Sequence, residues 1–514
     1  MNIIIKVVLL MGKVMKTIDK KGQDRLPYCE AYEKYLAEKN THFDLPGHEG
    51  NIHTELSRIC GHKIYKTDLN SPRGMDNLMK PTGPIKDAEE LFAKAVGADY
   101  CKFLINGSTS GNLIMLMSAL QANDKIILPR NVHKSVINGL ILSGAIPVFV
   151  MPEIDQSTEI AMQPTFETWK KVIDENSDAK AVFVINPTYF GSCCDLKKLV
   201  KYAHKKGMIV LADEAHGCHF YFSKKMPCSA MEAGADMSTT SVHKGGGSLT
   251  QSSALFIKSN IISDYNVMKA YNMITSTSPN TQLLASLDCA RKWLVFEGSK
   301  HINKVIGYAR YCVEEINKIP GFKAHGKDYF LSKGAYDFDE SKLIVEVDKL
   351  RINGFEVFRI LKDKYHVQGE LSETYALLYL FAIGMKKENC NILINALKEI
   401  SKEYYDPNIQ YEDHHYNNTF PELVLRPRVA FHAPLKKVKL EDCEGEVSKE
   451  AVMIYPPGIP IIVPGERFNK HVIQTIKYFK ETGCDIISEN PDAEYVNCVD
   501  SDTVEMKRLD KTIE

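Results

Sequence analysis

The chain has 514 residues, of which 44% are hydrophobic and 25% are charged, and its formal net charge is −1. This near-neutral balance gives no electrostatic field suited to nucleic acid or to an anionic membrane surface, so the sequence disfavours both partners. The thirteen cysteines are an odd number without CxxC pairs or histidines at zinc spacing. We therefore expect mostly reduced thiols in the core, with neither a disulfide framework nor a metal site.

The first residues, MNIIIKVVLLMGKVMK, form an apolar run that Lys6 interrupts, and no small-residue cleavage site follows. This pattern fits a signal peptide poorly and is too short for a membrane span. We expect a cytoplasmic location, and Met15 is a second candidate for the natural start. Residues 1–60 are predicted to form an N-terminal arm with helical segments.

Amphipathic helices alternate with short apolar strands in the next part of the chain. Short apolar strands between such helices are typical of a parallel sheet that is covered on both faces. We assign this α/β domain to residues 61–330. The predicted helices are 88–98, 110–121, 134–144 and 196–207, and the predicted strands are 100–105, 125–129, 146–151, 181–186, 208–215 and 236–242.

The pattern changes after about residue 330. The segments 342–347, 354–367 and 376–385 predict a smaller C-terminal α+β domain, which we assign to residues 331–514. Near its end, IYPPGIPIIVPGE (454–466) is rich in proline, which predicts irregular backbone in a rigid buried turn.

A candidate anion site follows the first strand. The segment INGSTSGN (105–112) ends a strand and opens a helix, so the backbone N–H groups near Gly107, Ser108 and Thr109 point outward at the positive end of the helix dipole. This arrangement suits a phosphate group. By itself it is weak evidence, because Ser or Thr before a helix is most often only a cap.

A second unusual strand end is VLADEAHG (210–217), where Asp213 ends an apolar strand. A carboxylate buried there needs a cationic partner. Asp213 could instead cap the next turn, but His216 close behind it favours a site.

The third feature is Lys244, which stands in TTSVHKGGGSLTQ just after the next strand. Alone it would be read as a surface lysine in a glycine loop. Ligands of parallel sheets bind beyond the carboxyl ends of the strands, where all three features fall. Pyridoxal phosphate (PLP) requires a lysine for attachment, a carboxylate for its pyridine nitrogen and an anion site for its phosphate, so one cofactor explains all three.

The run DEAHGCHF…GADMSTTSVHKGGGSLTQSSALF closely resembles the Orn/Lys/Arg decarboxylases of the aspartate-aminotransferase fold (PLP fold type I), in particular their short bacterial arginine/lysine decarboxylase branch. The resemblance covers most of the chain. Further motifs follow in family order: FDLPGHEGN (43–51), MDNLMKPTGPIKDAEELFAKAVGAD (75–99), NGSTSGN, PRNVHKS (129–135), NPTYFG (186–191), TSTSPNTQLLASLDCAR (275–291) and YPPGIPIIVPGE.

The resemblance implies roles for individual residues. Lys244 is similar to the lysine that carries the cofactor, and Asp213 to the partner of the pyridine nitrogen. His216 is similar to a side chain near the substrate carboxylate or the ring edge. The resemblance also assigns phosphate contacts to Ser108, Thr109, Ser241 and His243, with Gly107 beside them, and ring stacking to His133.

Further implications concern the partner subunit and the substrate. Ser276 matches a segment that crosses to the other subunit's site, which implies a homodimer or a higher even-numbered oligomer. A basic substrate needs a distal acceptor, for which Glu370 and Glu466 are candidates, although most glutamates are simply solvated.

The implied reaction is decarboxylation of a basic L-amino acid: arginine to agmatine first, then lysine to cadaverine, then ornithine to putrescine. A PLP-dependent aminotransferase or oxidase is the alternative on the same scaffold, and a catalytically silent homologue is a third hypothesis.

The sequence departs from the family pattern in two places. Gly245 and Gly246 follow the lysine where the family has bulkier residues, which suggests a looser lysine loop or an altered substrate pocket. Glu49 stands where the family has a lysine, so a role carried by that lysine does not transfer to this chain.

Overall fold

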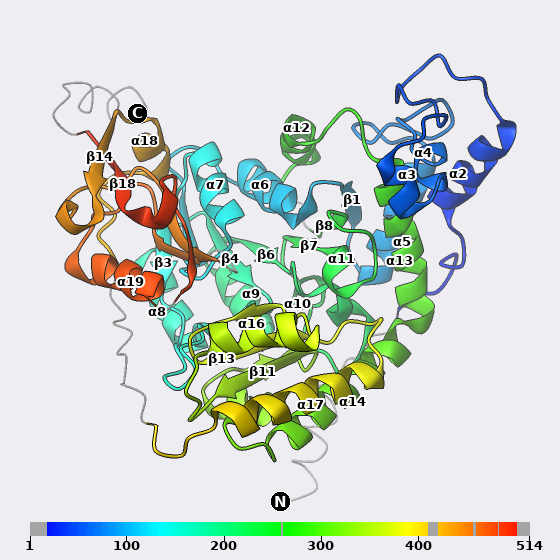
Figure 1. Ribbon diagram of the computed structural model, residues 1–514. Helices are drawn as coiled ribbons and strands as arrows, with labels where there is room; N and C mark the ends of the chain where they lie inside the picture. Colours follow the sequence, from blue (N-terminus) through cyan, green and yellow to red (C-terminus); the bar gives the residue numbers. More distant parts are fainter. Residues whose placement is uncertain (1–17, 259–260, 410–419, 456–458, 482, 501–514) are drawn as a thin grey trace, which may run out of the picture.

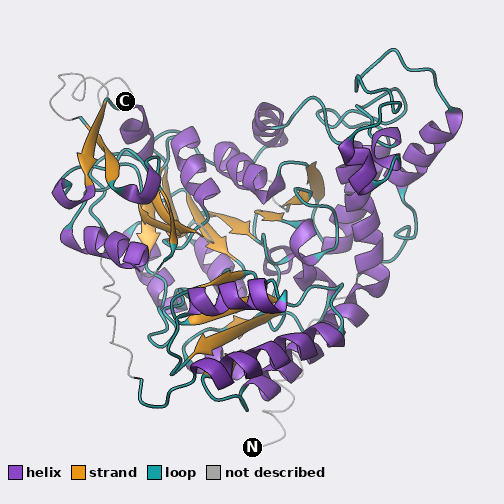
Figure 2. Ribbon diagram, in the orientation of Figure 1, coloured by secondary structure: helices purple, strands orange, loops and turns teal. Residues whose placement is uncertain are grey.

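The computed structural model describes residues 18–258, 261–409, 420–455, 459–481 and 483–500 (Figure 1). Met15, and with it part of the predicted arm 1–60, lies outside these residues. A large sheet with helices on both faces forms the centre of the molecule, and a smaller sheet with its own helices packs beside it (Figure 2).

The large sheet has seven strands in the order β1-β8-β7-β6-β4-β2-β3. Only β8 runs antiparallel to its neighbours, so the predicted, mainly parallel sheet is confirmed. The strands are β1 (Tyr100–Leu104), β2 (Lys125–Pro129), β3 (Ile146–Val150), β4 (Ala181–Ile185), β6 (Ile209–Asp213), β7 (Met237–Thr240) and β8 (Ser253–Ile257). Each strand predicted for this region exists within a few residues of its expected limits.

Helices cover both faces of this sheet. Figure 1 shows α6, α7 and α12 on one side and α8, α9 and α10 on the other. Helix α9 illustrates how such a helix packs against the sheet. Its apolar residues recur at helical spacing and are buried, namely Leu196, Leu199, Val200 and Ala203, while its lysines face solvent. The helices are α5 (Pro84–Val96), α6 (Gly107–Ala119), α7 (Lys134–Ser143), α8 (Phe166–Glu175), α9 (Leu196–Lys205), α10 (Ala230–Ala233), α11 (Val242–Gly245), α12 (Asp264–Ile274) and α13 (Thr281–Trp293).

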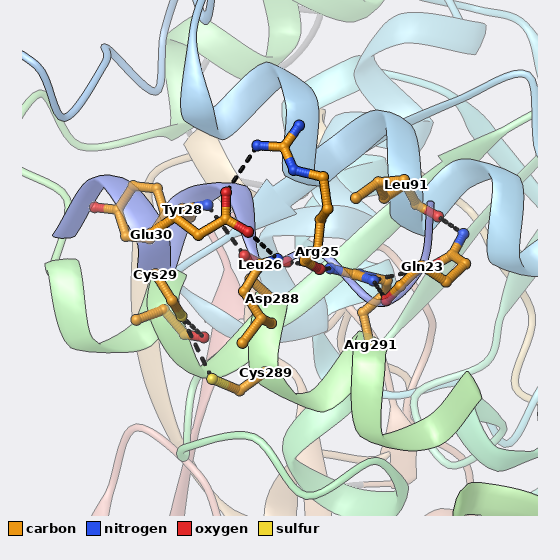
Figure 3. A network of polar contacts seen from close by, with 11 residues as sticks. Gln23, Arg25, Leu26, Tyr28, Cys29, Glu30, Leu91, Asp288, Cys289 and Arg291 are labelled. Carbon is orange, nitrogen blue, oxygen red and sulfur yellow. Dashed lines mark hydrogen bonds and ion pairs between the residues drawn. The ribbon is translucent and has the colours of Figure 1, made fainter. Parts of the chain in front are cut away.

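The N-terminal arm is fastened to α13 by a buried guanidinium (Figure 3). Arg291 donates to the backbone carbonyls of Gln23 and Arg25, at 2.5 and 2.6 Å, and to the carboxylate of Asp288 at 2.6 Å. Asp288 also accepts the backbone N–H of Tyr28 at 3.0 Å. Arm helices α2 (Pro27–Glu38), α3 (Glu55–Cys60) and α4 (Lys63–Lys66) follow this anchor.

A four-stranded antiparallel sheet, in the order β12-β13-β11-β9, forms the centre of the second unit. The segment 342–347 forms strand β11 (Lys342–Val347), and most of the segment 354–367 forms helix α16 (Gly354–Tyr365). Its other elements are β9 (Phe322–His325), β12 (Leu371–Ser372), β13 (Ala376–Leu380), α14 (Ser299–Ile316) and α17 (Lys387–Tyr404). The proposed limits of the domains, at residues 60 and 330, stay predictions.

The proline-rich segment 454–466 differs from the prediction of irregular backbone. Two antiparallel strands, β15 (Val452–Tyr455) and β16 (Ile459–Ile462), pair with each other here. Residues 456–458, between them in sequence, lie outside the described residues. Proline is tolerated because β16 is an edge strand and Pro460 lies next to a register shift. The remaining elements of this end are α18 (Pro427–His432), β14 (Leu435–Lys439), α19 (Lys470–Glu481), β17 (Asp485–Ile487) and β18 (Tyr495–Val499).

Candidate active site

A cavity of about 320 Å³ opens at the carboxyl ends of the strands of the large sheet. Such an edge is the usual ligand site of a parallel sheet, and the volume is typical of small-molecule pockets. The structure brings nine of the predicted site residues together in its lining: Gly107, Ser108, Thr109, His133, Asp213, His216, Ser241, His243 and Lys244.

Asp213 is the last residue of β6 and is almost fully buried. One carboxylate oxygen accepts the backbone N–H of Ala215 at 2.9 Å, and the other accepts a hydrogen from the amide of Asn112 at 2.8 Å. These bonds fix the carboxylate at the cavity wall. Asn112 was not predicted as a site residue, although it stands in the NGSTSGN motif.

The same asparagine links Asp213 to His133. The amide nitrogen of Asn112 also donates to the hydroxyl of Ser135 at 2.9 Å, and that hydroxyl lies 2.8 Å from Nδ1 of His133. The His133 ring caps α7 by accepting the Ser135 backbone N–H at Nδ1. The ring is therefore held in one orientation at the cavity, with Nε2 free to face a ligand.

The opposite part of the cavity is suited to an anion. Helix α6 begins at Gly107, so Ser108 and Thr109 lie in its first turn, where backbone N–H groups have no partner within the helix. The hydroxyls of Ser108 and Ser241 lie 2.8 Å apart, which joins the α6 end to the segment that precedes the lysine. The Nδ1–H of His243 donates to the carbonyl of Ser252 at 2.9 Å.

Lys244 lies in α11 and lines the same cavity as Asp213 and the start of α6. Its Nζ is 3.0 Å from Nε2 of His216, and the ring of Tyr189 lies nearby. Burial lowers the pKa of Lys244, although Asp213 and Glu370 counteract this effect. Burial also lowers the pKa of His216 well below its usual value, and Lys244 adds to the shift.

Lys342, the first residue of β11, is a site residue that the sequence did not reveal. It is 4% exposed, and its Nζ lies 2.8 Å from Nδ1 of His216. The only signal in the sequence was a lysine at the start of an apolar strand. Such a lysine usually faces solvent, so it gave no reason to expect a place beside the cavity.

Three predicted residues lie outside the cavity lining. Ser276 is exposed in the loop between α12 and α13. Glu466 is fully buried and accepts two hydrogen bonds from Arg130, at 2.6 and 2.8 Å, so its carboxylate is already occupied. Glu370 accepts a hydrogen bond from Tyr189, a residue of the lining, and therefore stands at the edge of the site.

The two glycines after Lys244 form a tightly packed turn. A Cβ at Gly245 would lie 2.8 Å from Nδ1 of His219, and one at Gly246 would lie 2.9 Å from the sulfur of Cys218. The glycines thus allow close packing of this turn, and a looser lysine loop or an altered substrate pocket stays a prediction. Glu49, the other departure, is exposed in the N-terminal arm and does not line the cavity.

In the described part of the chain, no group of three or more His, Cys, Asp or Glu side chains is arranged to hold a metal ion. None of the helices described is both long and apolar enough to cross a membrane.

Comparisons with known proteins agree with this geometry. The family model "Orn/Lys/Arg decarboxylase, major domain" matches residues 26–389, and "Orn/Lys/Arg decarboxylase, C-terminal domain" matches residues 410–491. An arginine decarboxylase of Bacillus subtilis (strain 168) is 37% identical over 474 residues, which cover 92% of this chain and 96% of that protein.

Solved structures show the same fold. The lysine decarboxylase LdcF of Francisella novicida superposes with a TM-score of 0.80 at 24% identity, over 92% of this chain and 81% of that one. An alanine–glyoxylate aminotransferase from Nostoc sp. gives 0.51 at 14% identity, over 63% and 88%. The expected aspartate-aminotransferase-like α/β fold is therefore confirmed, and the chain belongs to the Orn/Lys/Arg decarboxylase family of amino-acid decarboxylases.

Proposed function

We propose that this protein is a PLP-dependent decarboxylase that converts L-arginine to agmatine and carbon dioxide. The observation that carries the proposal is the cavity in which Lys244 stands between the carboxylate of Asp213 and the anion-binding end of α6. Membership of a decarboxylase family supports the reaction class.

The residues present fit the cofactor. Lys244 would attach it covalently, Asp213 would hold a proton on the pyridine nitrogen, and the start of α6 would bind the phosphate through Ser108 and Thr109. Ser241 and His243 complete the phosphate end, and His133 would lie against the ring. When bound, PLP supplies an electron sink for the α-carbon as the carboxylate leaves.

The chain's own residues would perform three tasks around this chemistry. The carboxylate of Asp213 is held in one place at the cavity wall, because Asn112 and Ala215 donate to it. Lys244 and His216, whose Nζ and Nε2 lie 3.0 Å apart in the cavity lining, would give a proton to the reacting carbon or take one from it. The orientation of the substrate decides which bond breaks, so an aminotransferase or oxidase remains the alternative outcome.

Arginine is proposed ahead of lysine. The relative named as an arginine decarboxylase is 37% identical, whereas the lysine decarboxylase whose structure is similar is 24% identical. Ornithine is third.

The test is to incubate the purified protein and PLP with each of the three amino acids and to quantify carbon dioxide, amine and keto acid. Agmatine and carbon dioxide in equal amounts are the expected products. Cadaverine would mean that lysine is the substrate, and putrescine that ornithine is. Keto acid or peroxide without carbon dioxide would favour transamination or oxidation. No product at all would indicate a silent homologue.

Glu370 is proposed as an acceptor for the distal cation of the substrate. It stands at the edge of the cavity through its bond to Tyr189, and its charge acts on Lys244. Glu370→Gln is expected to raise KM for arginine about 10- to 100-fold, because a hydrogen bond to a charged group is lost. Steady-state kinetics would measure this, with Glu346→Gln, in the same unit, as the control. An unchanged KM would exclude Glu370 as the acceptor for the distal cation of the substrate.

A homodimer or higher even-numbered oligomer is proposed for the assembly. The N-terminal arm exposes large apolar side chains, among them Phe43 (96%), Ile59 (70%) and Leu45 (64%), which a second copy would cover. The exposed position of Ser276 leaves it available to the partner's site. A cytoplasmic location is proposed because the structure forms no disulfide among the thirteen cysteines, all of which lie in the described residues.

A further inference from the structure

The imidazole of His216 lies between the amines of two lysines. Nε2 is 3.0 Å from Nζ of Lys244, and Nδ1 is 2.8 Å from Nζ of Lys342. His216 is 7% exposed and Lys342 is 4% exposed, so water has little access to either contact. The three side chains form a continuous array from β11 to the cavity.

The hydrogen-bonding capacity of these groups limits their protonation. An ammonium group only donates, whereas a neutral imidazole has one donor and one acceptor. One imidazole cannot satisfy two ammonium groups, because the ring nitrogen that carries hydrogen must donate to an unprotonated amine. Burial and the two lysines hold the pKa of His216 well below its usual value, so the ring is neutral. The array therefore holds at most one ammonium group, and at least one of the two lysines is a free amine.

One neighbouring carboxylate, Asp339, acts in favour of a charge on Lys342, against the burial that lowers the pKa of this lysine to about 8. Asp339 is fully buried, and its Oδ1 accepts from the backbone and hydroxyl of Ser341 at 3.0 and 2.7 Å and lies 3.1 Å from Nε2 of His219. Its Oδ2 has no hydrogen-bond partner among the described residues. Burial raises the pKa of Asp339, but His219 and Lys342 outweigh this and lower it overall. This carboxylate thus depends on nearby positive charge. Asp213, which faces Lys244, already has both oxygens bonded.

We propose that Lys342 is a positioning residue: its ammonium donates to Nδ1 of His216, which places the ring proton on Nε2 and holds Lys244 as an unprotonated amine. The inference rests on the proposed role of Lys244 in attaching the cofactor, since a free amine is the form that reacts with a carbonyl group. Lys342 does not line the cavity and acts through His216.

The array is sensitive to pH. Burial lowers the pKa of Lys342 to about 8, with Lys244 adding to the effect and Asp339 and Glu370 opposing it. Above that pH Lys342 loses its charge, so its influence on Lys244 is greatest below about pH 8. The titratable groups that face Lys342 are Cys193, His216, His219, Lys244, Asp339 and Glu370.

The test measures the protonation of Lys244 directly. The full-length chain, freed of cofactor, is acetylated with a small reagent at a series of pH values, and modification of Lys244 is quantified by mass spectrometry. In Lys342→Met the midpoint for Lys244 is expected to rise by about one to two pH units, because a neighbouring positive charge is lost and Nε2 becomes free to accept from an ammonium. Lys342→Arg should restore a midpoint close to that of the wild type.

The matched control is Lys323→Met, which removes a half-exposed lysine from β9 of the same sheet, away from the cavity, and should leave the midpoint unchanged. A midpoint in Lys342→Met equal to that of the wild type would overturn the proposal. A second measurement needs no variant at Lys342: in ¹⁵N-histidine spectra of the wild type near neutral pH, His216 should carry its proton on Nε2. A proton on Nδ1 would mean that Lys244 holds the charge, and the proposal would be wrong.

The two proposals fail separately. If the wild type decarboxylates none of the three amino acids but the midpoint still moves in Lys342→Met, the proposed function is wrong and the effect of Lys342 on the Lys244 amine holds. If decarboxylation occurs and the midpoint does not move, the proposed function holds and the role of Lys342 is wrong.

Discussion

Lys244→Ala is expected to lower the rate of arginine decarboxylation by more than about 1,000-fold and to abolish the visible absorbance of bound cofactor. The variant loses the amine of the one lysine in the cavity lining, and with it both the covalent attachment and a group able to move a proton at the reacting carbon. Release of ¹⁴CO₂ from carboxyl-labelled arginine measures the rate, and an absorbance spectrum of the purified protein measures attachment.

Lys134→Ala is the matched control for this variant. Lys134 is an exposed lysine at the start of α7, next in sequence to a cavity residue, and its loss should change neither the rate nor the spectrum. If Lys244→Ala keeps a wild-type spectrum and rate, another group attaches the cofactor and the proposed site is wrong.

The second large effect is expected for Asp213→Asn, which keeps the shape of the side chain and removes its charge. The rate should fall about 100- to 1,000-fold, the range seen when one preorganised electrostatic contact to a reacting group is lost. The absorbance of attached cofactor should persist, because Lys244 is unchanged. The loss should therefore appear in kcat with the cofactor still bound.

Asp236→Asn provides a control for the effect of neutralising a buried aspartate. Asp236 is 2% exposed, lies just before β7 at the opposite end of the strands, and accepts from the Val210 backbone. This variant should lose thermal stability but keep the kcat of its folded fraction. An equal loss of kcat in both variants would mean that Asp213 acts only on stability.

The elements that could be predicted best from the sequence are those whose burial is uniform along their length. Strand β4 is apolar along its whole length because helices cover both faces of the sheet, and that pattern is visible in a single sequence. The pairing of β15 with β16 was missed because proline normally argues against a strand. Only the position of β16 at a sheet edge makes Pro460 acceptable, and an edge position is not written in the sequence.

Some residues of the candidate site could likewise be predicted from the sequence, and others could not. The lysine, the carboxylate and the start of α6 each lie at the end of a strand or a few residues beyond it, so their meeting at one edge of the sheet could be predicted. Asn112 stood inside a recognised motif, but its donation to both Asp213 and Ser135 depends on how α6 lies against α7. The close packing of Gly245 against His219 likewise could not be predicted from the sequence, because these residues meet only in the folded chain.

The sequence by itself determined the fold class, the family and the residues at the ends of the parallel strands, because these follow from local patterning and from motifs in order along the chain. Only the tertiary structure decided that Glu466 accepts hydrogen bonds from Arg130 and that Nζ of Lys342 contacts Nδ1 of His216. Both contacts join segments far apart in sequence, and the burial of these side chains arises only when those segments pack together. Long-range packing of this kind leaves no periodic trace along the chain, which is why the partner of His216 was found only in the folded protein.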